Sequence, residues 1–596
     1  MGNDTLTDLL RAGPGPGPGP GMVWPSPGRR QALGKRRPAC GYDAAPPMMG
    51  YPSVAPSCPL SPLPTSGPDD LAATPAAVSP GVPNAAPLGS PDVRVLNLPK
   101  LQDFVRRHEQ PTDTPYGPTL STLLMALVSR SVMLEVSRAQ LAGETEWRPS
   151  RTSRAVQDAL QHELLAAPPR GRGPFGSASC FPVWKSDGIH VRLIVWPFDL
   201  NVNMPPPWSG LQPHADLRTL WAGSSFGVTL DMKGAFNQFG LSPSVQRLFT
   251  CRVGRQGRTK LYCASRLPMG WVGSPALCQR VLRLLLRVAA LAACSFCHID
   301  NVFIGGHSVA DVQAKVDAFL QLCASLDITM LVEGAIGTEV TFLGLLVNLT
   351  TKTATFKPAF VQKVADMQLV PLMQYQSFRI CVGLALWTAI MSNTRLFHLH
   401  NLLWTLSDAA RERAAVLPPQ LPSGDVQVSG AALGELRVMQ QKVRETFNLL
   451  APSPPVSAVH LTTDACHSGG AAVWTWGPGT KVLQCDHWPW SPDQLAHINV
   501  LEMLACDIAL ESDFPVGAAA VTLPWHTDSM VSLQAVLKGF SGSRHLGVPL
   551  ANALSRCESR GMVLAPTHVV SECNIADRPS RLYSSARSPV VVQEHW

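Results

Sequence analysis

Two proline-rich stretches limit where this chain of 596 residues can build a folded core. Pro, Gly, Ala and Ser dominate residues 1–95, as in the run GPGPGPGPG. Such a segment holds too little apolar surface to offset the entropy lost on ordering, so we expect a disordered Pro/Gly-rich tail there. A second stretch, APSPPVS at 451–457, favours a joint between two folded blocks.

The remaining sequence is too long for one hydrophobic core, so several domains are expected. No apolar run reaches the roughly 18 residues that span a bilayer, and the N-terminus lacks the basic and apolar regions of a secretory signal. The 15 cysteines show no disulfide rhythm, which favours a reducing compartment. We therefore predict a soluble, intracellular protein of the nucleus or cytoplasm, with no membrane partner.

The charge of the chain permits an anionic partner. A net charge of +7 is compatible with nucleic-acid binding. Within the tail, the basic cluster GRRQALGKRRPA is typical of a nuclear localisation signal or a nucleic-acid contact. Solvated tail charge explains the same cluster equally well.

Local patterning divides the folded part into helical and β-rich segments. Apolar and polar residues alternate around an Asp-Gly turn in FPVWKSDGIHVRLIVWPFDLN, which predicts a β-hairpin. The expected order is a helical extension, a strand-rich block, a helical connection, an alternating α/β block and a short tail, at 96–174, 175–360, 361–450, 456–582 and 583–596. This order predicts a multidomain protein of the α+β and α/β classes.

The stretch CSFCHIDNVFIGG, residues 294–306, supports two incompatible interpretations. Cys294, Cys297 and His298 spell the C-x-x-C-H pattern of covalent haem attachment. The second half instead predicts a short apolar hairpin that presents Asp300 beside Asn301. A reducing compartment argues against haem, and a metal site built from the two thiols and His298 lacks a clear fourth ligand.

Asp231 and Asp300 share a setting in which charge is costly, because each lies at the end or turn of an otherwise apolar β segment. Two such carboxylates side by side repel each other unless a cation lies between them. The pair suits Mg²⁺ ions that also bind substrate phosphates and stabilise the attacking and leaving oxygens of a phosphoryl transfer. Turn capping by either aspartate alone is the simpler alternative.

Five segments over about residues 175–360 resemble, in order, the fingers, A, B, C and E motifs of retroelement reverse transcriptases. They are RLIVWPFDLN, LDMKGAFNQFGL, LPMGWVGSPALCQRVL, HIDNVFIGG and VTFLGLLV. The resemblance implies a right-hand palm-and-fingers polymerase followed by a helical connection. It also implies that Asp231 is the motif A metal ligand and Asp300 the first acid of motif C, with two Mg²⁺ ions per site and Mn²⁺ as the alternative.

The same resemblance assigns substrate-binding roles to further residues. Phe236 falls at the bulky ribose gate, which would clash with a 2′-hydroxyl and so favour deoxynucleotides. Gln279 matches the loop and helix that pack the templating base pair. Lys185 and Arg192 lie on the hairpin that covers the triphosphate, where fixed positive charge stabilises developing negative charge. Solvated hairpin charges are an equal alternative for both cations.

Three residues or segments depart from the family pattern. Asn301 stands where motif C usually has its second aspartate, and Gly234 stands where many relatives have a second acid or polar residue of motif A. The lysine expected in LVEGAIGTEV is missing, and Glu333 and Glu339 are the charges there. Because an amide brings no negative charge to a cation, Asn301 predicts a weakened or unusually metal-dependent polymerase, to which it would still contribute as a substrate-site residue.

The last block carries four acids in the order strand, helix, strand end and terminal helix: Asp464, Glu502, Asp528 and Asp577. With the ending N-x-A-D-x-x-S-R at 574–581, this order resembles retroelement RNase H domains over residues 456–582. The resemblance implies two Mg²⁺ ions about 4 Å apart that activate water and stabilise the leaving 3′-oxygen. Capping would explain the aspartates singly but not Glu502. His568 lies where relatives place a loop histidine that assists product release, or it is a plain surface histidine.

Together the resemblances predict a reverse transcriptase with a C-terminal RNase H-like domain. It would copy an RNA template from a DNA or RNA primer with dNTPs and degrade the RNA of the RNA–DNA hybrid. The IN-x-L-E helix and the N-x-A-D-x-x-S-R ending look most like tyrosine-recombinase retrotransposons of the DIRS group, including VIPER elements. Two alternatives stay open: a hybrid nuclease whose polymerase half is only a nucleic-acid clamp, and a catalytically dead binding protein.

Overall fold

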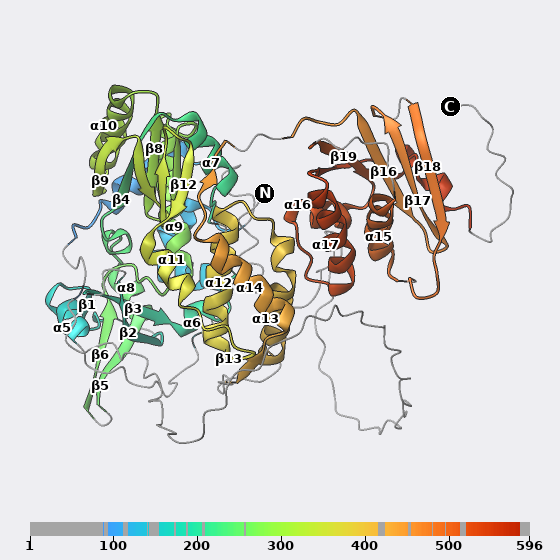
Figure 1. The fold of residues 1–596 in the computed structure, drawn as a ribbon. Helices are drawn as coiled ribbons and strands as arrows, with labels where there is room; N and C mark the ends of the chain where they lie inside the picture. The colour runs from blue at the N-terminus through green and yellow to red at the C-terminus, as the bar shows by residue number, and fades with distance from the viewer. Residues whose placement is uncertain are drawn as a thin grey trace, which may run out of the picture. The chain divides into compact units, whose positions relative to one another are not determined.

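The computed structural model describes most of the chain after residue 87 (Figure 1). The described residues are 88, 93–110, 117–139, 141, 154–171, 175–185, 189–205, 209–255, 258–414, 424–450, 454–478, 481–494, 496–512 and 520–583. The predicted N-terminal tail with its basic cluster lies outside them except for Leu88 and 93–95, and the C-terminal tail lies outside them except for Tyr583. The Asp-Gly turn of the predicted hairpin is also outside the described residues.

The first described helices are amphipathic and pack on the later core. They are α2 Leu98–His108, α3 Leu120–Ala126, α4 Arg130–Ser137 and α5 Arg154–Gln161. Asn97 caps α2 by accepting a hydrogen bond from the Lys100 backbone N–H at 3.1 Å. Arg280, from a helix far along the chain, donates to the Pro118 carbonyl at 2.8 Å and pairs with Glu109 at 3.4 Å. These two contacts of Arg280 connect the helical extension to the strand-rich block.

A five-stranded sheet with the order β1-β6-β5-β2-β3 contains the predicted hairpin. Its strands are β1 Leu165–Ala166, β2 Ala178–Trp184, β3 Val191–Pro197, β5 Thr250–Arg255 and β6 Arg258–Ala264. Strands β2 and β3 pair antiparallel with Val183 opposite Arg192, which confirms the hairpin. Short helical turns flank this sheet: α6 Phe198–Asn201, α8 Pro243–Gln246 and η3 Arg247–Phe249.

A second sheet of the strand-rich block has the order β7-β8-β4-β9 (Figure 1). Its strands are β4 Phe226–Met232, β7 Ser295–His298, β8 Asn301–Gly306 and β9 Met330–Gly337. The helical elements around it are α7 His214–Gly223, η2 Ala235–Gln238, α9 Gly273–Val288 and α10 Val309–Ser325. Buried side chains such as Leu230, Val302 and Leu285 pack the sheet and the helices into one core. Asp231 of β4 and Asp300 of the β7–β8 turn are therefore attached to a well-packed part of the fold.

The helical connection follows a small antiparallel sheet. That sheet has the order β10-β11-β12-β15 and comprises β10 Glu339–Phe342, β11 Leu345–Asn348, β12 Thr353–Phe356 and β15 Phe447–Asn448. The connection comprises α11 Pro358–Ala365, α12 Tyr375–Met391, η4 Leu396–Leu399, α13 His400–Ala414 and α14 Gly430–Lys442, with the pair β13 Leu372–Gln374 and β14 Asp425–Gln427. Its helices share a core that includes Phe378, Leu402 and Leu436.

The C-terminal block is a mixed five-stranded sheet with the order β18-β17-β16-β19-β20. Its strands are β16 Val459–Ala465, β17 Gly469–Trp476, β18 Lys481–Pro489, β19 Thr522–Thr527 and β20 Val563–His568. Strands β16 to β18 pair antiparallel, whereas β19 pairs parallel with both β16 and β20. The helices are α15 Ile498–Glu511, α16 Met530–Lys538, α17 Arg544–Ser559 and α18 Asp577–Ser580, with the turn η5 Ser571–Cys573.

Buried Trp474 and Trp525 join one face of this sheet to α15 and α17. The structure therefore confirms a mixed α and β multidomain fold. None of the described helices combines the length and the hydropathy that a membrane-spanning segment needs.

Candidate active sites

The β7–β8 hairpin brings Asp231 and Asp300 together. Asp231 is the penultimate residue of β4 and pairs directly with Asn301, the first residue of β8. The Met232 backbone N–H donates to the Asp300 carbonyl at 2.8 Å. The hairpin turn is Ile299–Asp300, and Ile299 has a φ of 60°, a region that β-branched residues rarely adopt. The two acids predicted from separate strands therefore lie at the same end of one sheet.

Asp231 is held in an environment that disfavours its charge. Burial raises the pKa of Asp231 to about 6, and the charges of Asp300 and Glu333 add to the rise, while Arg192 and Lys185 oppose it. Asn301 donates its side-chain N–H to Asp300 Oδ1 at 2.8 Å. The amide thus supports one carboxylate without adding a third charge, and the residues present fit a divalent cation between Asp231 and Asp300.

Gln279 lies behind the hairpin rather than on an open surface. Its side chain is fully buried, donates to the Cys297 carbonyl at 3.1 Å, and accepts a hydrogen bond from the Ile299 backbone N–H at 2.5 Å. These bonds fix the strained turn that carries Asp300. The structure thus gives Gln279 a contact with the hairpin, whereas its predicted contact with the templating base pair stays a prediction.

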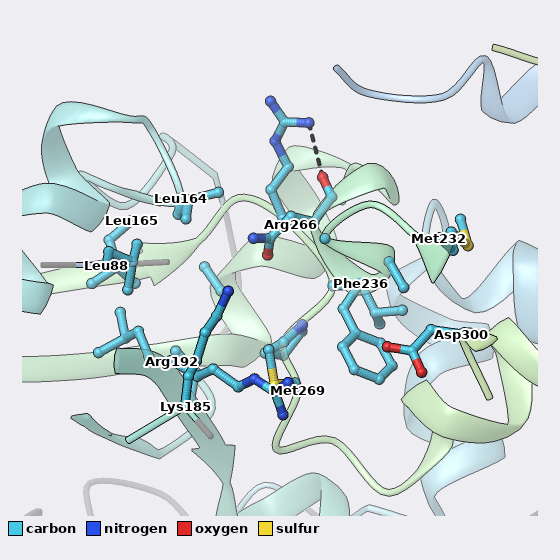
Figure 2. A pocket seen from close by; sticks show the side chains of 18 of the residues that line it. Leu88, Leu164, Leu165, Lys185, Arg192, Met232, Phe236, Arg266, Met269 and Asp300 are labelled. Carbon is cyan, nitrogen blue, oxygen red and sulfur yellow. Dashed lines mark hydrogen bonds between the residues drawn. The ribbon is translucent and has the colours of Figure 1, made fainter. Parts of the chain in front are cut away.

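A pocket opens in front of the two acids (Figure 2). Asp231 and Asp300 line it together with Phe236, Lys185 and Arg192. Figure 2 shows the Phe236 ring beside the Asp300 carboxylate, with Lys185 and Arg192 across the pocket. Five of the residues singled out in the sequence therefore face one cavity that has carboxylates on one side and cations on the other. Such a cavity suits a phosphorylated ligand bound through cations.

The glycine at position 234 has a local structural reason. Gly234 caps η2 with a φ of 54°, in the left-handed region that glycine adopts without strain. The 3₁₀ turn that follows presents Phe236 to the pocket. An acid of the family type at this position would carry a conformational cost.

The C-terminal sheet gathers three acids from three elements. Asp464 comes from β16, Glu502 from α15, and Asp528 from the junction between β19 and α16. Carboxylate oxygens of these three residues lie within 4.8 Å of one another. This is the one such group of His, Cys, Asp or Glu side chains among the residues that the structure describes.

Glu502 has a more strongly raised pKa than Asp464. Burial raises the pKa of Glu502 to about 9, and the charges of Asp464 and Asp528 add to the rise. Its Oε2 atom is buried and has no hydrogen-bond partner within the described part of the chain. Burial also raises the pKa of Asp464 to about 6. An orphaned oxygen among repelling carboxylates fits a divalent cation.

Asp577 and His568 border this cluster. Asp577 begins α18, accepts a hydrogen bond from Arg581 Nε at 3.0 Å, and contributes to the raised pKa of Asp464. His568 is exposed at the end of β20 and pairs in register with Thr527, next to Asp528. The predicted roles of Asp577 as a fourth ligand and of His568 in product release stay predictions.

Three polar residues around the acids received no role from the sequence. Asn574 donates to Asp464 Oδ1 at 3.0 Å, Ser580 donates to Asp464 Oδ2 at 2.5 Å, and Ser571 donates to Asp528 Oδ2 at 2.6 Å. Asn574 and Ser580 belong to the ending N-x-A-D-x-x-S-R. This motif was the sequence signal from which a role for them could have been predicted. At the site of Asp231 and Asp300, the sequence marked Glu333 only as a departure from the family pattern. The structure shows that its negative charge adds to the raised pKa of Asp231.

The C-x-x-C-H match has a structural explanation that involves no haem. Cys297 is fully buried and its sulfur accepts a hydrogen bond from Gln279 at 3.2 Å, while the Cys294 thiol donates to the Leu291 carbonyl at 3.5 Å. The His298 ring packs against the rings of His214 and Trp387. These three side chains therefore take part in the packing around the β7–β8 hairpin.

Two carboxylates that face cations across one pocket suit a phosphorylated ligand, and comparison with known families is more specific. Residues 191–345 match the family model described as "Reverse transcriptase (RNA-dependent DNA polymerase)". This part of the chain is therefore a reverse transcriptase domain. The matched segment contains Asp231, Phe236, Gln279, Asp300 and Asn301.

Solved structures similar to this chain include two complexes of foamy viral protease–reverse transcriptase. The dRH form bound to double-stranded DNA is 14% identical, with a TM-score of 0.40, over 80% of this chain and 83% of that chain. The complex with an RNA/DNA hybrid is 14% identical, with a TM-score of 0.39, over 85% of this chain and 66% of that chain. A search of the curated proteins found no significant match.

Proposed function

We propose that this protein is an RNA-directed DNA polymerase with ribonuclease H activity. It would copy retrotransposon RNA into DNA inside the cell, in the nucleus or cytoplasm, and degrade the RNA of the hybrid. The observation that carries the first activity is the pocket of Asp231, Asp300, Lys185 and Arg192, of which all but Lys185 belong to the reverse transcriptase domain. The observation that carries the second is the buried cluster of Asp464, Glu502 and Asp528.

In the first reaction the primer 3′-hydroxyl attacks the α-phosphorus of a dNTP, a P–O bond forms, and pyrophosphate leaves. Mg²⁺ ions, or Mn²⁺, held by Asp231 and Asp300 would supply charge stabilisation for the attacking and leaving oxygens. Lys185 and Arg192 bind the triphosphate through their positive charge. The Phe236 ring, which lies beside Asp300 (Figure 2), would clash with a 2′-hydroxyl and so favour deoxynucleotides.

In the second reaction water attacks a phosphate of the RNA strand and the 3′-oxygen leaves. Asp464, Glu502 and Asp528, with Asp577 as the fourth acid, would hold two Mg²⁺ ions that supply the activation of that water. His568 lies at the border of the site, where it would assist departure of the product. RNA template, primer and hybrid are gripped mainly through phosphates, so binding weakens as salt rises.

Amino-acid order in the C-terminal block also supports a more specific origin. The IN-x-L-E helix corresponds to the start of α15, and the N-x-A-D-x-x-S-R ending begins directly after η5 and includes α18. These features are most like tyrosine-recombinase retrotransposons of the DIRS group. We propose this affiliation for the chain.

Primer extension tests the polymerase. Wild type should extend a primer on an RNA template, and Asp300→Ala should abolish extension because one of the two carboxylates is lost. Asp317→Ala is the matched control, since Asp317 is exposed on α10. Extension by Asp300→Ala at the wild-type rate would contradict the assignment.

A hybrid nuclease with an inactive polymerase half is the second candidate, and Asn301 is the observation that favours it. The amide leaves the polymerase site with one carboxylate fewer than the family pattern. Cleavage of the RNA strand without any dNTP incorporation, in Mg²⁺ and in Mn²⁺, would select this alternative. Loss of both activities with retained hybrid binding would indicate a binding protein.

A further inference from the structure

Asn574 occupies the centre of the C-terminal acid cluster. Its side chain is buried, and Nδ2 lies 3.0 Å from Asp464 Oδ1 and 3.3 Å from Asp528 Oδ1. The same nitrogen lies 3.3 Å from the Thr463 carbonyl of β16. One amide group therefore bridges two carboxylates, one at the end of β16 and one at the junction between β19 and α16.

The other end of Asn574 organises the element that carries the fourth acid. Asn574 Oδ1 accepts a hydrogen bond from the Ala576 backbone N–H at 3.1 Å, and the Asn574 carbonyl accepts one from the Asp577 backbone N–H at 3.0 Å. These two bonds shape the turn that begins α18. Through one residue, β16, the β19–α16 junction and α18 are tied together.

The amide is chemically suited to this position. A carboxylate here would add repulsion to a cluster in which the pKa of Glu502 is already raised, and an ammonium would occupy the place of a metal ion. A neutral N–H donor holds carboxylates in place and leaves their charge available to a cation. Each carboxylate oxygen has about two lone-pair directions, so a hydrogen bond from Asn574 leaves room for a ligand bond.

Two hydroxyl groups complete the arrangement around the same acids. Ser580 donates to Asp464 Oδ2 at 2.5 Å, and Ser571 donates to Asp528 Oδ2 at 2.6 Å. Both oxygens of Asp464 and both oxygens of Asp528 thus accept a protein hydrogen bond. The orientation of each carboxylate is set before any cation arrives.

We propose that Asn574 is a positioning residue of the nuclease site, whose amide sets the separation and orientation of Asp464 and Asp528 for divalent cations. The inference rests on the proposed nuclease function. It goes beyond that function by assigning metal affinity to a residue that is not itself a metal ligand.

Mn²⁺ binding to the full chain tests the proposal directly. Electron paramagnetic resonance of a Mn²⁺ titration gives the total binding, and the part lost in Glu502→Gln belongs to the C-terminal site. Asn574→Leu keeps the approximate shape but removes the amide, and should weaken this part by about 10- to 100-fold. Asn574→Gln keeps an amide and should recover part of the affinity.

Cleavage of an RNA–DNA hybrid gives the second readout. Asn574→Leu should raise the Mg²⁺ concentration for half-maximal cleavage by a similar factor, while primer extension stays at the wild-type rate and shows that the reverse transcriptase domain is intact. Asn552→Leu is the matched control, because Asn552 on α17 bonds to Asp507, outside the site. Its Mn²⁺ binding should equal that of wild type.

Unchanged Mn²⁺ affinity of the C-terminal site in Asn574→Leu would overturn the proposal. Absence of cleavage by the wild type would instead contradict the nuclease function. The Mn²⁺ comparison would then still decide whether Asn574 positions the acids.

Discussion

Replacing Glu502 by glutamine should stabilise the C-terminal sheet at alkaline pH while removing nuclease activity. The pKa of Glu502 is raised to about 9 from an ordinary value of 4.5, first by burial and then by the charges of Asp464 and Asp528. In the folded state without a divalent cation, this carboxyl group therefore keeps its proton at neutral pH. In the unfolded chain the same group ionises near its ordinary pKa.

The sign and size of the effect follow from this difference in proton binding. The folded state binds more protons than the unfolded state between pH 4.5 and 9, so the free energy of unfolding falls as pH rises through that window. One pKa unit corresponds to 1.36 kcal/mol, so at pH 8 the loss has an upper limit of about 5 kcal/mol. Glutamine cannot ionise, and Glu502→Gln should avoid this loss.

Hydrogen exchange measured by mass spectrometry on peptides of β16 and β17 reports the opening free energy of this sheet alone. In EDTA at pH 8, exchange through opening of the sheet should be slower in Glu502→Gln than in wild type, and the difference should vanish near pH 4.5. Glu511→Gln, on the exposed end of α15, is the control and should follow wild type. An equal pH dependence in wild type and Glu502→Gln would refute the reasoning.

Three further predictions concern the reverse transcriptase domain. Asn301→Asp should raise Mg²⁺-dependent primer extension by about tenfold or more, because it adds a second charge beside Asp300; identical rates would show that Asn301 does not limit catalysis. Phe236→Ala should raise the use of rNTPs relative to dNTPs by about 10- to 200-fold in single-nucleotide incorporation assays, and an unchanged ratio would exclude the ring as the sugar gate. Gln279→Leu should lower the free energy of unfolding in urea by about 1–3 kcal/mol, because the Ile299 N–H loses its partner; no loss would argue against its role behind the hairpin.

Much of the central sheet could be predicted because its signals are local. Apolar runs that end in Asp231 and turn at Asp300 identify two strands, and the order of motifs indicates that they pair. The register was not predicted, and only the structure shows that Asp231 lies opposite Asn301. In the C-terminal block, the alternation of strands and helices could likewise be predicted from local patterns, whereas the order and direction of its strands are known only from the structure.

Contacts between distant elements could not be read from local patterns. Gln279 is one of several polar residues around a long helix, and only the packed structure shows its amide against the Ile299 N–H and the Cys297 carbonyl. Asn574 bonds to Asp464 and Asp528, which are more than forty residues away in sequence. The disordered tail and the fourth-ligand role of Asp577 remain predictions.

A single gel assay tests the central claim that one chain carries two active sites. A primer annealed to a labelled RNA template is incubated with the protein and Mg²⁺, with and without dNTPs. Wild type should extend the primer and cut the RNA strand, Asp300→Ala should only cut, and Glu502→Gln should only extend. Loss of both activities in either variant, or cutting and extension that survive in both, would contradict the assignment of the two sites.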